Sequence, residues 1–263
     1  MSSLESCFSQ VEEIRLFPGI YDHHGGVTVE ITDRMEYEIF ASILRASLLH
    51  WRKQGKSGVW MKFPIELVNL VEAAVKEGFW FHHAEPTYLM LAYWIPEGVH
   101  SLPANASHRV RIGALVVNDK REVLVVQESK GRFQGIWKFP TGIVNQGEDI
   151  CVAAVREVKE ETAIDTEFVK VLAFRQNHRT FFEKSELCFM CMLHPLSFDI
   201  QEQESEIAAA QWMPWEEYMA KPSLQEHDFW KRIVALCLSE EDGDCSVVCN
   251  SNVPPASPLN FYA

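Results

Sequence analysis

The chain has 263 residues, of which 47% are hydrophobic and 23% are charged, so it can bury one large core or two small ones. Its formal net charge is -13. A surface this acidic repels DNA, RNA and anionic membranes on average, which argues against nucleic-acid and membrane partners. An anionic substrate would then need local Lys or Arg, or a metal ion that bridges carboxylate and phosphate.

Between residues 25 and 96, short β-branched or aromatic runs alternate with apolar residues at helical spacing. Pro64 suits the first turn of a helix and Gly78 suits its end. The first 24 residues look like a loose N-terminal segment. We therefore predict a small βαβαββ domain at residues 25–96. Its elements are expected, in chain order, at residues 27–31, 40–51, 58–63, 64–78, 79–85 and 88–95.

The small domain holds a dense set of aromatic residues for a unit of roughly 75 residues, a size that buries little surface on its own. Some of them fill its core, and the remainder would leave an apolar patch that monomers rarely expose. We expect a homodimer with this domain at the interface; packing on the other domain and docking of a protein partner are alternatives. The aromatic residues are Trp51, Phe79, Phe81, Trp60, Trp80 and Trp94.

Residues 97–106 contain Pro and Gly with few large apolar residues, which is typical of a linker. A second domain is predicted at residues 107–240, followed by a flexible, proline-rich tail at 241–263. A loop rich in glycine and aromatic residues is expected at 131–142. Strands are predicted at residues 111–117, 123–127, 168–178, 187–193 and 209–213, and helices at residues 150–162, 215–220 and 225–239.

The cysteines, seven in number, are interpreted as reduced thiols. Cys188 and Cys191 lie in an apolar strand without a second pair at zinc-ligand spacing, so a zinc site is not expected. The first residues do not form a signal peptide, and no apolar run approaches the roughly 18 residues of a membrane span. A cytoplasmic location is therefore expected.

Three glutamates of the helix at 150–162 carry the chemistry. Glu157, Glu160 and Glu161 are spaced i, i+3 and i+4, so a helix places them on one face. The crowded carboxylates repel each other unless a hard cation such as Mg²⁺, Mn²⁺ or Ca²⁺ neutralises them. Arg156 can hold a carboxylate in a fixed orientation, and the carbonyl of Gly142 can be a further metal ligand.

The segment from 142 to 164 reads GIVNQGEDICVAAVREVKEETAI and resembles the Nudix box, G-x5-E-x7-R-E-U-x-E-E-x-G-U, where U is a bulky aliphatic residue. Ala163 departs from the pattern, because it stands where the box has glycine. If this position is left-handed, alanine costs about 1 kcal/mol of backbone strain without loss of a ligand. The matching residues are Gly142, Glu148, Arg156, Glu157, Val158, Glu160, Glu161 and Ile164.

Residues 82–91, 103–109 and 168–176 are similar to the plant Nudix group that acts on ADP-ribose and NADH, and to the animal Nudix protein encoded antisense to a fibroblast growth factor. The resemblance implies an α+β protein: a Nudix α/β/α sandwich with a mixed sheet, preceded by a small domain. It also implies Mg²⁺-dependent hydrolysis, with Mn²⁺ as an alternative metal. ADP-ribose would give AMP and ribose 5-phosphate, and NADH would give AMP and the reduced mononucleotide.

Roles for individual residues follow partly from this resemblance. Glu160 or Glu161 is the expected general base, and Nudix enzymes often recruit a further glutamate from a later loop, for which Glu206 is the first candidate and Glu204 the second. Lys138 and Arg175 are expected to contact phosphate, with Arg132 as another candidate. Phe133, Phe181 or Phe182 is expected to stack on a base. Ordinary packing is the alternative for each of these residues.

Two other functions stay open. One is hydrolysis of a different diphosphate, such as coenzyme A, a dinucleoside polyphosphate or an isoprenyl diphosphate, since the box binds metal and diphosphate rather than the flanking groups. The other is a regulator that binds nucleotide without turnover, to which Ala163 points and against which the intact Arg156, Glu157, Glu160 and Glu161 argue.

Overall fold

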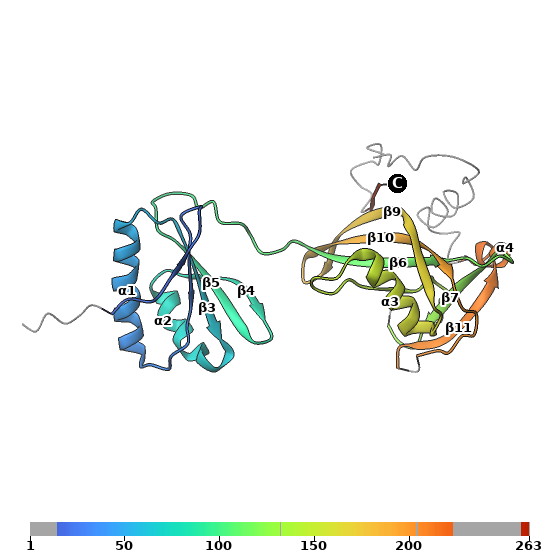
Figure 1. The fold of residues 1–263 in the computed structure, drawn as a ribbon, viewed down its shortest axis with the longest axis horizontal. Helices are drawn as coiled ribbons and strands as arrows, with labels where there is room; N and C mark the ends of the chain where they lie inside the picture. The colour runs from blue at the N-terminus through green and yellow to red at the C-terminus, as the bar shows by residue number, and fades with distance from the viewer. Residues whose placement is uncertain (1–14, 132, 204, 223–258, 263) are drawn as a thin grey trace, which may run out of the picture. The chain divides into compact units, whose positions relative to one another are not determined.

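The computed structural model of the protein describes residues 15–131, 133–203, 205–222 and, for the backbone, 259–262. The chain divides into two compact units, Met1–Asn105 and Ala106–Ala263, each of which has its own sheet (Figure 1). The division falls within the predicted linker at 97–106. The mixture of helices and mixed sheets confirms the predicted α+β class.

The first unit is a sheet with the strand order β1-β2-β3-β5-β4. Strands β2 and β3 are parallel, and the other pairs are antiparallel. The predicted βαβαββ order is confirmed, although the second helix begins as a 3₁₀ turn. The elements are β1 (Ile20–Tyr21), β2 (Val27–Glu30), α1 (Tyr37–Lys53), β3 (Gly58–Pro64), η1 (Ile65–Leu70), α2 (Val71–Lys76), β4 (Trp80–Glu85) and β5 (Tyr88–Trp94).

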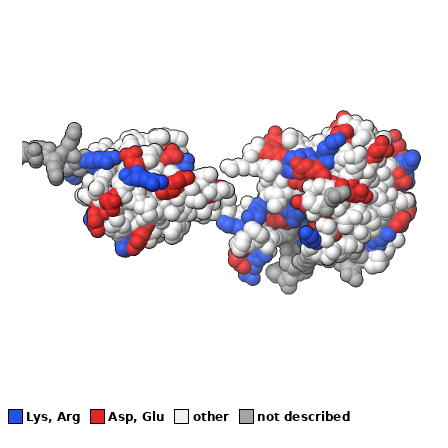
Figure 2. All heavy atoms as spheres, turned by 90° about the horizontal axis from the view of Figure 1, so that it is seen from below, with Lys and Arg blue, Asp and Glu red and all other residues white. Residues whose placement is uncertain are grey.

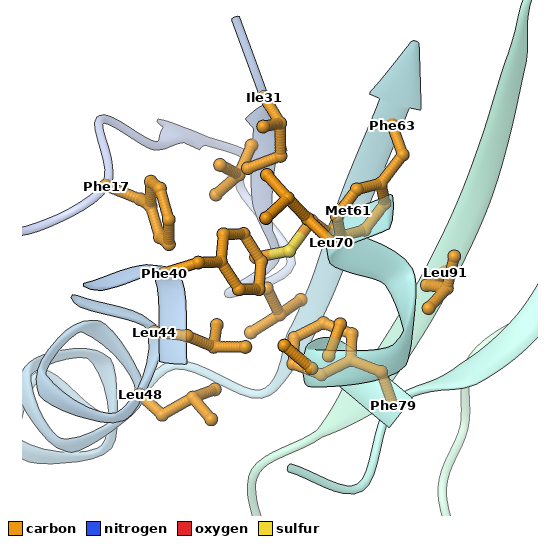
Figure 3. Packing of buried hydrophobic residues seen from close by; sticks show 14 of the residues in the cluster. Phe17, Ile31, Phe40, Leu44, Leu48, Met61, Phe63, Leu70, Phe79 and Leu91 are labelled. Atoms are coloured by element: carbon orange, nitrogen blue, oxygen red, sulfur yellow. The ribbon is translucent and has the colours of Figure 1, made fainter. Parts of the chain in front are cut away.

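The core of this unit lies between the helices and the inner face of the sheet, as Figure 3 shows. Phe17 is part of it: its ring lies 5.3 Å from that of Phe40, and its N–H donates to Ser47 Oγ at 2.9 Å. Together with strand β1, this contact corrects the expectation that residues 1–24 are a loose segment, at least from residue 15 onward.

Adjacent residues of a strand, such as His82 and His83, ordinarily point to opposite faces. Instead their Nδ1 atoms lie 2.7 Å apart, because the register of β4 shifts between Phe81 and His83. His82 Nε2 bonds the Pro103 carbonyl and His83 Nε2 bonds the Tyr88 hydroxyl. Since a carbonyl can only accept, His82 donates to Pro103 and accepts from His83. The pair thus ties residue 103 to the small unit, which is a structural role.

The second unit contains a five-stranded sheet with the order β12-β9-β10-β6-β8 and a two-stranded sheet of β11 and β7. The parallel pairing of β6 and β10 makes the larger sheet mixed, as expected. The elements are β6 (His108–Val116), β7 (Glu122–Glu128), β8 (Thr141–Ile143), α3 (Ile150–Thr162), β9 (Thr166–Phe181), β10 (Lys184–Pro195), β11 (Ile207–Pro214), α4 (Trp215–Met219) and β12 (Leu259–Tyr262).

Alternate residues of the strands face two separate cores. Ile112 and Ala114 of β6 pack with Ala154 and Val158 of α3, whereas Leu115 packs on the other side with Tyr218 of α4. The sheet therefore lies between α3 and α4, which is the predicted sandwich. Its α3 side carries the motif helix against a buried support.

Two regions differ from the predictions. Residues 131–142 were expected to be a loop, but Thr141–Ile143 forms strand β8 beside β6. Residues 259–262, placed in the flexible tail, form the edge strand β12, which pairs with β9. The helix predicted at 225–239 lies outside the described residues. In the part of the chain that is described, no helix is long and apolar enough to cross a membrane.

Candidate active site

Helix α3 has the predicted bounds and carries most of the motif. It follows Asp149, whose backbone is extended, and ends at Ala163 in the left-handed conformation with φ 60°. The Ala163 N–H donates to the Lys159 carbonyl, and the Lys159 ammonium returns a bond to the Ala163 carbonyl, each at 2.9 Å. The expectation that position 163 is left-handed is confirmed.

Replacing Ala163 by glycine is expected to raise the Tm by about 2 °C and to keep or raise kcat/KM. Glycine removes about 1–2 kcal/mol of left-handed strain but adds about 0.4–1 kcal/mol of unfolded-state entropy, which leaves a small gain. Thermal denaturation and initial rates measure the two effects. A large fall in activity would show that the turn after α3 depends on the alanine methyl group.

Arg156 organises three of the motif carboxylates. Its Nε and Nη2 donate to the two oxygens of Glu148 at 2.7 and 2.9 Å. Its Nη1 donates to Glu157 at 2.8 Å and to Glu160 at 3.0 Å, and Nη2 also reaches the Ile143 carbonyl at 3.0 Å. These five bonds equal the donor capacity of a guanidinium. Arg156 is therefore a positioning residue, and its side chain holds the pKa of Glu148 down at about 2.

Gly142 is required for space. A Cβ atom at this position would lie 1.7 Å from the carboxyl carbon of Glu157, well inside contact distance. Strand β8 thus passes directly over the Glu157 carboxylate, which is largely buried and has its pKa raised, chiefly by burial. The sequence pattern contained this glycine, but only the structure shows which side chain it makes room for.

Glu161 is the most buried of the motif glutamates, with 6% of its surface exposed. Burial raises the pKa of Glu161 to about 8, although the nearby ammonium of Lys138 and the Thr141 backbone N–H act in the opposite direction. Its Oε2 atom has no hydrogen-bond partner among the described residues. A buried carboxylate oxygen without a partner costs free energy unless another group, such as a cation, satisfies it.

Lys138 lies beside Glu161 and is already paired. Its ammonium contacts Glu128 at 2.6 Å and Thr141 Oγ1 at 2.7 Å, and only 12% of its side chain is exposed. Glu128, which the sequence analysis missed, thus joins the candidate site from the end of β7. The signal for it was weak, since a glutamate that ends a strand is ordinarily a surface residue.

Other predicted site residues lie in loops or elsewhere on the sheet. Glu206 is exposed, and its backbone carbonyl accepts a hydrogen bond from the Ser129 N–H. The Glu206 N–H donates to the Gln203 carbonyl, and the Gln203 N–H in turn donates to the Glu161 carbonyl. This loop therefore lies against the end of α3. Phe133 is 47% exposed. Arg175 is half-buried on β9, where it stands opposite Cys188 of β10 in the strand register.

The other aromatic candidates, Phe181 and Phe182, lie at the turn between β9 and β10. Phe181 stacks under Arg109 at 3.9 Å near the β9–β10 turn, and Phe182 is 84% exposed at that turn. Glu204 and Arg132 lie outside the described residues. Figure 2 shows acidic and basic side chains interspersed on the visible face of each unit, so a substrate anion must be met by particular cations.

The donor set fits a hard divalent cation. Among the described residues, no three His, Cys, Asp or Glu side chains converge closely enough to hold a metal, because Arg156 takes oxygens of Glu157 and Glu160. The chemistry nevertheless suits Mg²⁺, which prefers oxygen ligands. The unpartnered Oε2 atom of Glu161 and the cradle that Gly142 leaves over Glu157 are the observations that support this fit.

Comparison with known families assigns both units. Residues 17–95 match the family model described as the Nudix hydrolase domain, and residues 107–235 match the NUDIX domain. The chain is 57% identical over 245 residues to Nudix hydrolase 2 of Arabidopsis thaliana, covering 92% of this chain and 88% of that protein. It is 50% identical over 233 residues to Nudix hydrolase 7 of the same plant, covering 87% and 83%.

A more distant relative and a solved structure were also found. The human protein named nucleoside diphosphate-linked moiety X motif 6 is 38% identical over 203 residues, covering 74% of this chain and 64% of that protein. The crystal structure of a MutT protein from Methanosarcina mazei Go1 superposes with a TM-score of 0.42 at 23% identity, covering 51% of this chain and 97% of that one.

Proposed function

The chain belongs to the Nudix hydrolase family, whose members act on nucleoside diphosphates linked to another moiety, and we propose that its own substrates are ADP-ribose and NADH. The glutamate cluster of α3, where Arg156 orients three carboxylates and Glu161 keeps a buried oxygen without a partner, is the observation that supports hydrolysis of a diphosphate. The choice of ADP-ribose and NADH rests on the resemblance of residues 82–91, 103–109 and 168–176 to the plant Nudix group. Hydrolysis of coenzyme A or another diphosphate, and nucleotide binding with weak turnover, are the alternatives.

We propose Glu157, Glu160, Glu161 and the Gly142 carbonyl as the residues that hold Mg²⁺, with Mn²⁺ as a possible substitute. The metal would neutralise the diphosphate and make a bound water more acidic. The Nη1 of Arg156 donates to one oxygen of Glu157 and one of Glu160, so the other oxygen of each carboxylate would be the one to bind the metal. Glu148 would keep its two bonds to Arg156 and hold that side chain in place.

The chain's own residues would divide the remaining work. One carboxylate takes a proton from the attacking water; Glu160, Glu161 and Glu206 are the candidates. The water oxygen forms a bond to one phosphorus while the bond between that phosphorus and the bridging oxygen breaks, so the second phosphate leaves with its oxygen. Lys138 and Arg175 would bind phosphate, and Phe133 would contact the base. Lys138 must exchange part of its pairing with Glu128 to do so.

A panel of diphosphates tests the substrate assignment. ADP-ribose, NADH, coenzyme A, a dinucleoside polyphosphate and an isoprenyl diphosphate would be compared by kcat/KM at saturating Mg²⁺, with products separated by chromatography. We expect ADP-ribose or NADH to lead by at least tenfold and to yield AMP. A lead for coenzyme A would move the assignment to that alternative, and background rates for all would favour the regulator.

The stability of the metal-free protein should depend on the protonation of Glu161. The pKa of Glu161 is raised from 4.5 to about 8, so the folded state holds a proton that the unfolded state has lost between these values. The stabilising contribution is therefore complete below about pH 4.5 and is lost as the pH rises to about 8. We expect the Tm of the wild type to fall relative to that of Glu161→Gln over this range.

Differential scanning fluorimetry in EDTA measures both Tm curves. Adding Mg²⁺ should stabilise the wild type most near pH 8, because the ligand oxygens bind metal in their ionised form. Parallel Tm curves for the two proteins from pH 5 to 8 would contradict the assignment of the buried proton to Glu161.

We further propose a cytoplasmic homodimer whose interface is provided largely by residues 25–96. Trp51 and Phe79 fill the core of this unit, whereas Phe81 on the edge strand β4 is 61% exposed. Exposed apolar groups on an edge strand favour association with another chain. For the location, the described cysteines Cys151, Cys188 and Cys191 are free thiols, as is usual in a reducing compartment.

Light scattering of the full chain and of a truncated chain that begins at Ala106 tests the homodimer. The full chain should be dimeric at micromolar concentration, the truncated chain should be monomeric, and Phe81→Asp should weaken the dimer. A monomeric full chain would contradict the proposal. A dimeric truncated chain would move the interface to the second unit.

A further inference from the structure

The face of the large sheet that lies opposite α3 carries a second polar cluster. On β6, Ile112 and Ala114 face α3, so Arg111 points to the other side. On β10, Met190 faces that same side, and Glu186 precedes it by four residues, an even number, so it faces the same side. Arg111 Nη1 lies 3.7 Å from Glu186, and its Nη2 lies 3.4 Å from Thr141 Oγ1.

This cluster is continuous with the catalytic end of the unit. Thr141 also accepts from Lys138, and its backbone N–H lies at Glu161. Arg111 stands two residues before Gly113, the residue that pairs with Thr141, which corresponds to about 7 Å along the strand. A group attached to a diphosphate at Glu161 would therefore meet Arg111 and Glu186 next along the sheet.

The bonding of the two arginines is different. Arg156 uses its donors at 2.7 to 3.0 Å, whereas the contacts of Arg111 are long for hydrogen bonds, at 3.4 and 3.7 Å. The side chain of Arg111 is 36% exposed, so a ligand can reach it. Arg111 thus has donors that a ligand can use, while those of Arg156 are engaged.

Glu186 offers the complementary acceptors. Its side chain is 17% exposed, and its shortest polar contact in the described structure is a 3.3 Å bond from Asn177 Nδ2. A carboxylate has room for about four hydrogen bonds. The vicinal hydroxyls of a ribose supply two O–H donors with the spacing of the two carboxylate oxygens, and a neighbouring guanidinium binds phosphate or sugar oxygens.

We propose that Arg111 and Glu186 form the subsite for the ribose next to the diphosphate, with Glu186 accepting from its two hydroxyls and Arg111 donating to the adjoining phosphate. This inference rests on the proposed function and deepens it, because it identifies residues that select a sugar-linked diphosphate. Substrates that lack a vicinal diol beside the diphosphate are then disfavoured.

The test pairs enzyme variants with altered substrates. ADP-ribose would be compared with two analogues, one lacking the 2- and 3-hydroxyls of the adenosine ribose and one lacking those of the other ribose. The variants are Glu186→Gln, Arg111→Gln and Arg111→Lys. Arg109→Gln is the matched control, since it removes the same charge from the same strand and face, two residues away. Tm values exclude variants that fail to fold.

We expect Glu186→Gln and Arg111→Gln to raise the KM for ADP-ribose about tenfold and to change kcat less than about threefold, with a smaller effect for Arg111→Lys and Arg109→Gln. The analogue that lacks the hydroxyls bound by Glu186 should already have a raised KM with the wild type. Glu186→Gln should not raise the KM of that analogue any further. An equal change for all three substrates, or an unchanged KM, would overturn the subsite alone. A folded wild type without turnover of ADP-ribose would instead overturn the proposed function, and the subsite with it.

Discussion

Glutamine at position 157, 160 or 161 is expected to lower kcat by well over tenfold in each case. Each substitution removes a carboxylate that we propose as a metal ligand, while it keeps the size and shape of the side chain. Initial rates at saturating Mg²⁺ measure the effect. Glu167→Gln is the control, because Glu167 is an exposed glutamate of the same unit that lies outside the cluster.

The three variants should differ in stability. Glu161→Gln should raise the Tm of the metal-free protein at pH 8 by several degrees (about 3 °C or more), since it replaces a buried carboxylate whose pKa is about 8. Glu160→Gln should leave the Tm nearly unchanged, because 53% of the Glu160 side chain is exposed. Near wild-type turnover in all three variants would exclude the cluster as the catalytic centre.

Gly142→Ala is expected to lower kcat/KM by more than about tenfold and the Tm by several degrees (about 5 °C). The added Cβ would lie 1.7 Å from the Glu157 carboxyl carbon, so either strand β8 or the Glu157 side chain has to move. Overpacking of a well-packed site costs about 1–3 kcal/mol. A displaced Glu157 would also lose its proposed role as a metal ligand, so the loss of activity should exceed what the loss of stability explains.

Gly147→Ala is the matched control for this variant. Gly147 lies in the loop between β8 and α3 with φ +76°, and a Cβ there would meet nothing within 4 Å. Alanine at 147 therefore introduces backbone strain without a collision, and it should lower the free energy of unfolding by about 1 kcal/mol while leaving the rates nearly intact. Equal losses of activity in the two variants would show that backbone conformation, rather than the contact with Glu157, explains Gly142.

Local patterns predicted the elements whose determinants lie close together in the sequence. Helix α3 has the predicted bounds because its apolar spacing and its termini are encoded within the segment 149–164. Strand β8 was missed because it has only three residues, in a segment rich in glycine and aromatic residues, and so shows no alternation of apolar and polar side chains. Its strand pairing depends on β6, about thirty residues earlier in the chain.

The candidate site was predictable in its residue types but not in its contacts. The motif indicated that Arg156 holds a carboxylate. However, the two hydrogen bonds from Arg156 to Glu148, and the collision that Gly142 avoids, depend on how β8 crosses α3. The sequence pattern did not single out Arg111 or Glu186, and its signal for Glu128 was weak. They meet only because β6 pairs with the distant β10 and because β7 ends beside Lys138.

The most direct test of the central claim is the turnover of ADP-ribose by the full chain in Mg²⁺ and in EDTA, with AMP and ribose 5-phosphate both quantified. The account predicts equal amounts of the two products in Mg²⁺, loss of turnover in EDTA, and loss of more than nine-tenths of the rate in Glu161→Gln. Turnover that is unaffected by EDTA and by Glu161→Gln, or a folded wild type that releases no AMP from ADP-ribose, would contradict it.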